Sequence, residues 1–127
     1  TMTMSHAISW FEIPTLELPR ATDFYAAITG HALARTDFYG TPMVVFPGAP
    51  EEVRGCLVQS ERQVPGGGQR IYLACDHLPG RLDGVLARVA PAGGEVVLPR
   101  TDIGRAGSMA LIKDSEGNVV GLHEEAA

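Results

Sequence analysis

The sequence predicts an α+β domain built from two copies of one unit, each with the element order β-α-β-β-β. Two segments with helical spacing of apolar residues lie roughly sixty residues apart, and each stands between strand-like segments at matching distances. Each helical segment also follows a Leu-Pro pair, Leu18-Pro19 in the first copy and Leu78-Pro79 in the second. One amphipathic helix arises easily by chance, whereas a matched pair with matched strands indicates a duplication.

Each copy opens with a strand whose two faces differ in polarity. Phe11, Ile13, Ile71 and Leu73 form the apolar face, and Trp10, Glu12, Arg70 and Tyr72 form the other. The apolar face is expected to pack against the helix of its own copy. The second set is costly to bury without partners, so we expect it to line a shared ligand pocket. The alternative is that Glu12 and Arg70 form an ion pair inside a filled barrel.

The two helices are predicted from apolar stripes with the spacing i, i+3, i+4, i+7. These stripes are Ala21, Phe24, Tyr25 and Ile28 in the first copy, and Leu82, Val85, Leu86 and Val89 in the second. Proline before each stripe suits a first helical turn, and glycines after each stripe favour its end.

Three strand segments follow each helix. They are residues 32–39, 43–46 and 55–58 in the first copy, and 95–100, 109–112 and 121–123 in the second. A ferredoxin-like barrel fits less well, because it would place two strands rather than three between helices. The Gly-rich stretch 64–68 has the composition of a flexible linker. We therefore expect a single domain over 7–125, with module one at about 7–62 and module two at about 69–125.

Composition and charge narrow the classes of function. The 127 residues are 45% hydrophobic and 20% charged, as in a globular domain, and the formal net charge is −5. Scattered Lys and Arg argue against a nucleic-acid partner and against an anionic membrane surface. Cys56 and Cys75 lie in apolar segments and are expected to be buried thiols. Without a signal-like or membrane-spanning segment, the cytoplasm is the expected location.

Three segments together resemble one known superfamily. FEIPTLELPRATDFYAAITG, GGEVVLPRTDIG and DSEGNVVGLHE are similar to the vicinal oxygen chelate superfamily, most closely to its glyoxalase-like branch of lactoylglutathione-lyase-related proteins. The resemblance extends over about 8–124. It implies the glyoxalase/bleomycin resistance/dioxygenase fold, in which two βαβββ modules form a half-open eight-stranded barrel, often in a homodimer. Whether the barrel closes within one chain or between two is left open.

In metal-using members of this superfamily, the first and last strands of the two modules supply four ligands. The resemblance places these positions at Trp10, Arg70 and Gly121, and at Gly55 or Leu57 depending on the register. Tryptophan offers only an N–H donor, arginine stays protonated, and neither glycine nor leucine has a donor atom in its side chain. We therefore expect no metal and no other cofactor.

Neighbouring residues supply the candidates for binding and catalysis. Glu12 and His123 share strand faces with the ligand positions and form the candidate acid–base pair. A ligand is expected to contact Trp10, Arg70, Tyr72, Leu57, Gln59 and Gly121. A displaced metal site of Glu12, His123 and Gln59 is an alternative, but it requires three shifts of roughly 6–7 Å along the strands.

The sequence favours a protein that binds a small anionic or aromatic molecule without a metal. In this interpretation Arg70 faces an anionic group and Trp10 provides a wall for stacking. One alternative is a metal-independent isomerase or lyase that uses Glu12 and His123. Another is a divalent-metal lyase or dioxygenase, as in better-known members of the superfamily. The sequence does not decide whether a reaction is catalysed.

Overall fold

The structure, a computed structural model, describes residues 10–49 and 52–127. The elements are β1 (Trp10–Pro14), α1 (Leu18–Thr29), β2 (Ala34–Phe38), β3 (Thr41–Val45), β4 (Arg54–Val58), β5 (Tyr72–Ala74), α2 (Arg81–Val89), β6 (Glu95–Asp102), the short 3-10 helix η1 (Gly104–Ala106), β7 (Ser108–Lys113) and β8 (Val119–Glu124). The predicted α+β class and the repeated β-α-β-β-β order are confirmed. Residues 7–9 of the expected domain lie outside the described residues.

Each module forms one four-stranded mixed sheet, with strand order β1-β4-β3-β2 in module one and β5-β8-β7-β6 in module two. In both sheets the first strand runs parallel to the last, because the helix returns the chain to the same end of the sheet. Ile13 pairs with Leu57 in module one, and Leu73 pairs with Leu122 in module two. This shared register makes the β1–β4 pair of module one equivalent to the β5–β8 pair of module two.

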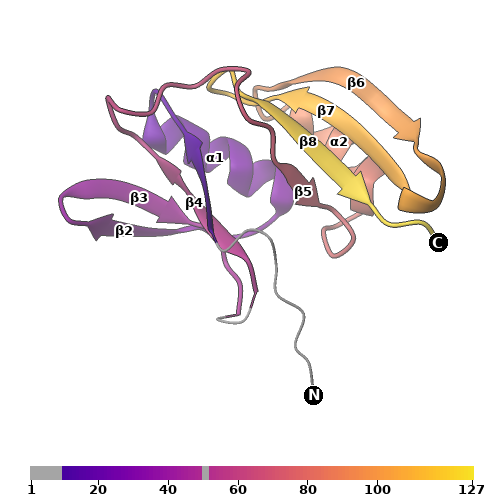
Figure 1. Ribbon diagram of the computed structural model, residues 1–127, viewed down its shortest axis with the longest axis horizontal. Coiled ribbons are helices and arrows are strands. Elements are labelled where there is room, and N and C mark those ends of the chain that lie inside the picture. The colour runs from indigo at the N-terminus through magenta and orange to yellow at the C-terminus, as the bar shows by residue number, and fades with distance from the viewer. Residues whose placement is uncertain (1–9, 50–51) are drawn as a thin grey trace.

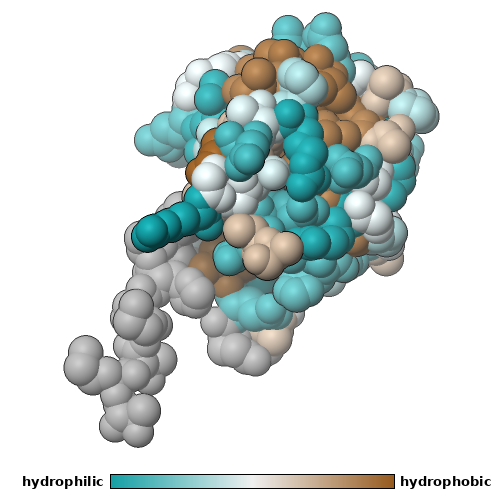
Figure 2. Space-filling model, turned by 90° about the vertical axis from the view of Figure 1, so that its right-hand side faces the viewer, coloured by the Kyte–Doolittle hydropathy of each residue, from teal (hydrophilic) through white to brown (hydrophobic). Residues whose placement is uncertain are grey.

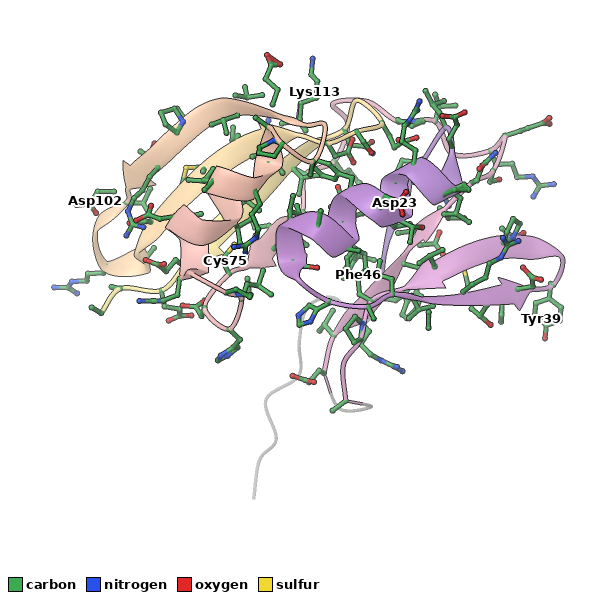
Figure 3. The ribbon with its side chains drawn as sticks, turned by 180° about the vertical axis from the view of Figure 1, so that it is seen from behind. Asp23, Tyr39, Phe46, Cys75, Asp102 and Lys113 are labelled. Atoms are coloured by element: carbon green, nitrogen blue, oxygen red, sulfur yellow. The ribbon has the colours of Figure 1, made fainter. Side chains whose placement is uncertain are left out.

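Both helices lie on the same side of the two sheets, behind them in Figure 1 and in front in Figure 3. The helices contact each other, and one hydrophobic core joins both modules. The predicted apolar stripes face this core, in which the largest buried helical side chains are Phe24, Tyr25, Ile28, Leu82, Val85 and Val89. The opposite faces of both sheets are left without a covering helix.

The N-terminus of α1 is capped by a residue of the other module. The carboxylate of Glu116, in the turn between β7 and β8, accepts the backbone N–H groups of Leu16 and Glu17 at 2.8 Å each. Arg20 donates to the same carboxylate at 2.7 Å. A carboxylate at this end of a helix satisfies free N–H groups and suits the helix dipole. At the other end, Gly30 with φ +74° ends α1, as predicted.

The same β7–β8 turn makes further bonds to module one. The hydroxyl of Tyr25 donates to Asp114 at 2.7 Å in the buried interior. The side-chain amide of Asn118 donates to the Pro14 carbonyl at 2.8 Å, and its oxygen accepts the N–H of Gly66 in the linker at 3.1 Å. The β7–β8 turn of module two is therefore hydrogen-bonded to both module one and the linker.

The two ends of the molecule expose apolar side chains. At one end the β2–β3 hairpin projects from module one, and Figure 3 shows Tyr39 at its tip. Tyr39 and Gly40 have φ of 49° and 82°, the combination of a tight two-residue hairpin turn. At the other end, shown in Figure 2, hydrophobic residues gather over β6, where Val96 and Val97 are exposed.

No helix among residues 10–49 and 52–127 is long and apolar enough to span a bilayer.

Candidate functional site

The side chains that point away from the helices define an open face on each sheet. The strand registers place Trp10, Glu12, Met43, Cys56 and Val58 on the open face of module one, and Tyr72, Ala74, Met109, Gly121 and His123 on that of module two. Both open faces lie on the side of the molecule that faces the viewer in Figure 1. Trp10 is 37% exposed and Tyr72 is 50% exposed in the single chain.

The open face of module two contains a hollow of about 400 Å³, lined by Tyr72, Ala74, Ile103, Met109 and His123. Ala74, Met109 and His123 meet there because β8 lies between β5 and β7. Ala74 on β5 and Met109 on β7 both pair with His123 on β8. Apolar walls with one phenol and one imidazole are typical of a small-molecule site. Sequence analysis selected Tyr72 and His123 but missed the other three. The strand register, once known, identifies Ala74 and Met109.

Gly121 allows the ring of Tyr72 to lie across β8. A Cβ atom added at Gly121 would collide with the Cγ, Cδ2 and Cε2 atoms of that ring. Sequence analysis expected a ligand to contact Gly121, and the structure shows that the Tyr72 ring covers this glycine. The pair therefore forms one wall of the hollow.

His123 is oriented by the η1 segment. Its Nε2 atom lies 2.6 Å from the carbonyl oxygen of Ala106. Because a carbonyl only accepts, the proton of this bond belongs to Nε2, and the neutral ring keeps Nδ1 as a hydrogen-bond acceptor. His123 can therefore accept a hydrogen bond from a ligand hydroxyl, or act as a base, without losing its own anchor.

Glu12 and Arg70 lie apart from this hollow. The carboxylate of Glu12 accepts Nε2–H of Gln63 at 2.7 Å and Nε1–H of Trp10 at 3.4 Å. In the part of the chain that the structure describes, Glu12 and Arg70 form no ion pair, and Arg70 is exposed just before β5. The candidate pair Glu12 and His123 therefore stands on different modules, each residue with its own partners.

The expected directions of the Leu57 and Gln59 side chains are wrong. Leu57 is fully buried in the core on the helix side of β4. Gln59 follows on the same side, and its side-chain oxygen accepts the N–H of Leu18 at the start of α1 at 2.8 Å. The reason is the pairing of Leu57 with Ile13, which turns Leu57 toward the helix and Cys56 toward the open face.

Cys56 is the structural counterpart of Gly121, since each directly precedes the leucine that pairs with the first strand of its module. Gly55, the position that the sequence favoured, packs against Phe11 on the helix side instead. The thiol of Cys56 lies 3.5 Å from the sulfur of Met43. Burial, reinforced by the nearby charge of Glu12, raises the pKa of this thiol to about 12, so it stays protonated.

Comparison with known proteins places this fold and site in context. No family model matches the sequence. The mycobacterial proteins named "Putative glyoxylase CFP32", from Mycobacterium bovis and Mycobacterium tuberculosis, are 29% identical to this chain over 121 residues, or 90% of it. The chain spans less than half of their length, 44%.

Two solved structures share the fold over nearly the whole chain. TnmS3, described as an antibiotic binding protein from Streptomyces sp. CB03234, is 27% identical with a TM-score of 0.66 and covers 98% of this chain and 99% of its own. A glyoxalase/bleomycin resistance protein from Albidiferax ferrireducens T118 is 16% identical with a TM-score of 0.69, covering 94% and 99%. These comparisons support the resemblance of the chain to the vicinal oxygen chelate superfamily, and the solved structures share its fold.

The superfamily's metal positions do not fit a divalent cation in this chain. With the observed register they fall on Trp10, Arg70, Cys56 and Gly121. Trp10 has an indole and Arg70 a guanidinium, the Cys56 thiol is buried and protonated, and Gly121 has no side chain. Within residues 10–49 and 52–127, no three His, Cys, Asp or Glu side chains gather in a group that could hold a metal ion.

Proposed function

We propose that this protein binds a small aromatic molecule in the hollow of module two, without a metal. The observation that carries the proposal is the exposed Tyr72 ring beside His123, within walls that are otherwise apolar. An aromatic ligand can stack on Tyr72, and a hydroxyl or carboxylate on that ligand can bond to the imidazole. The description of TnmS3 as an antibiotic binding protein supports a binding role on this fold.

We also propose that a second copy of the chain covers the open faces. Trp10, Tyr72 and Ile103 are large apolar side chains that remain exposed on or beside these faces. Because both faces lie on the same side, a two-fold partner can set its module one over module two of the first copy. In that arrangement Glu12 of one copy could act together with His123 of the other.

Binding is tested by calorimetric titration with 2-naphthol and with naphthalene-2-carboxylate, which separate a neutral from an anionic ligand. We expect saturable binding of at least one probe, with affinity reduced about tenfold or more in Tyr72→Ala and in His123→Ala. Tyr39→Ala removes the same side chain from the hairpin tip and should leave the affinity unchanged. Absence of saturable binding, or equal affinity of Tyr72→Ala and wild type, would contradict the proposal.

The dimer is tested by sedimentation equilibrium over a range of protein concentrations. Wild type should sediment as a dimer, and Trp10→Glu, which puts a charge on the open face of module one, should shift it toward the monomer. Val97→Glu makes the same kind of change at an exposed position of β6, the outer strand of module two, and serves as the control. A monomeric wild type, or a dimer insensitive to Trp10→Glu but broken by Val97→Glu, would show that the open faces are not the interface.

A further inference from the structure

A second pocket lies in the seam between the two modules, with a volume of about 470 Å³. We call it the seam pocket. Its lining includes Phe11, His31, Phe46 and Arg54 from module one, and Leu73 and His77 from module two. Because both modules contribute, the pocket exists only when they are packed together.

The floor of the seam pocket belongs to the shared core. The rings of Phe11 and Phe46 lie 5.7 Å apart at a tilt of 41°, and Phe46 also makes an edge contact with Tyr25 at 5.7 Å. Leu73 and Leu78 from module two pack against the same cluster. Figure 3 shows Phe46 below α1, at the base of the β2–β3 hairpin. The floor is therefore a preformed apolar surface, and only its rim is built from loops.

The rim carries nitrogen-rich side chains. His31 and His77 are exposed and Arg54 is half-buried. The Arg54 stem packs over Gly48, where an added Cβ would come within 2.8 Å of its Cγ, so this glycine lets the arginine lie along the pocket. Glu52 also lines the rim, but its carboxylate already accepts a backbone N–H of its own turn at 2.6 Å. The rim therefore suits an anionic group more than a cationic one.

We infer that the seam pocket binds an amphipathic organic anion, with its apolar body on the Phe11–Phe46 floor and its carboxylate or sulfonate near Arg54. Burial of the body supplies the favourable free energy, and the guanidinium fixes the head group through charge-assisted hydrogen bonds. The volume is in the range of pockets for small organic ligands. This site is independent of the hollow in module two, although Ala74, on the edge strand β5, borders both.

The test uses 8-anilinonaphthalene-1-sulfonate, an aromatic anion whose fluorescence rises in an apolar site. It is titrated into wild type, Arg54→Glu, Arg62→Glu and Tyr72→Ala. We expect a saturable site whose Kd rises tenfold or more in Arg54→Glu. The Kd should stay within about twofold in Arg62→Glu, which makes the same charge change in the exposed turn after β4. Tyr72→Ala alters the hollow and so separates dye bound there from dye bound in the seam pocket.

Amide chemical shifts locate the dye directly, with the largest changes expected at Thr29, His31 and Leu78. If Arg54→Glu proves unfolded by circular dichroism, His77→Glu in the loop before α2 replaces it, with the same expected loss. The inference fails if folded wild type shows no saturable binding, or if the charge reversal leaves the Kd unchanged. It also fails if Tyr72→Ala abolishes binding and the shifts map to Met109, which would assign the dye to the hollow.

Discussion

Replacing Glu116 with glutamine should destabilise the protein by about 3 kcal/mol at neutral pH, and by much less in acid. The side chain is fully buried, and its two carboxylate oxygens are both occupied. Oε1 accepts the N–H groups of Leu16 and Glu17, while Oε2 accepts Arg20 Nε–H at 2.7 Å and the Ser115 hydroxyl at 2.9 Å. A glutamine in this place would set an NH₂ donor against a donor. It would also leave the Arg20 guanidinium with only the exposed carboxylate of Glu17, at 2.6 Å, as counter-charge.

The magnitude follows from the ionisation of Glu116. Burial by itself raises the pKa of this carboxyl, but hydrogen bonds from Arg20, from the Glu17 N–H, from Ser115 and from the Leu16 N–H outweigh it and lower the pKa from 4.5 to about 2. At 1.36 kcal/mol per pKa unit, this corresponds to about 3 kcal/mol. Because the folded-state pKa is the lower one, the stabilisation is complete above pH 4.5 and is lost as the pH falls toward 2. Less than half of it should remain near pH 3.

Urea unfolding followed by far-UV circular dichroism at pH 7, 5 and 3 measures this dependence. Glu116→Gln is compared with wild type and with Glu61→Gln, which removes an exposed carboxylate from the turn after β4. The difference in the free energy of unfolding should be about 3 kcal/mol at pH 7 and about 1 kcal/mol at pH 3, and Glu61→Gln should stay near zero throughout. A difference below 1 kcal/mol at pH 7, or one that is equal at pH 7 and pH 3, would refute the assigned role.

Three further predictions concern the open faces and the thiols. Gly121→Ala should displace the half-exposed Tyr72 ring, so the affinity for 2-naphthol or naphthalene-2-carboxylate should fall while the thermal midpoint changes little. Unchanged affinity would contradict the conclusion that Tyr72 and Gly121 together form a wall of the hollow. Burial raises the pKa of the Cys56 thiol to about 12 and that of the Cys75 thiol to about 11. Ellman's reagent at pH 8 should therefore react slowly with both thiols in the native protein and rapidly in urea. Fast labelling of the native protein would show that a thiol is accessible. Zn²⁺ or EDTA should leave the thermal midpoint unchanged, and a Zn²⁺-dependent rise would reveal a cation site.

The fold could be predicted because its signals are local and periodic. The stripe through Tyr25 and Ile28 has a helical period, and the alternation in β1 separates Ile13 from Glu12. In β4 the residues from Gly55 to Val58 are all buried, so neither face of the strand is marked by polar residues. Without alternation, the sequence could not show which way Leu57 points. That direction is set by the pairing of β4 with β1.

The parts of the site that sequence analysis missed depend on contacts distant in the chain. Ile103 reaches the hollow only because β6 bends into η1, and His123 is anchored by the carbonyl of Ala106 in that segment, 17 residues earlier. Glu116 caps a helix that begins about 100 residues before it, so neither segment carries a capping signal by itself. Such contacts follow from the tertiary arrangement and leave no periodic mark in the sequence.

The single core shared by α1 and α2 makes the two halves of the chain depend on each other. Each helix packs against the sheet of its own module and against the other helix, so a solitary half would expose to water the part of its apolar surface that meets the other half. The 64–68 stretch keeps the two halves together at a fixed ratio. Two polypeptides cut within that stretch should accordingly recombine when expressed in the same cell.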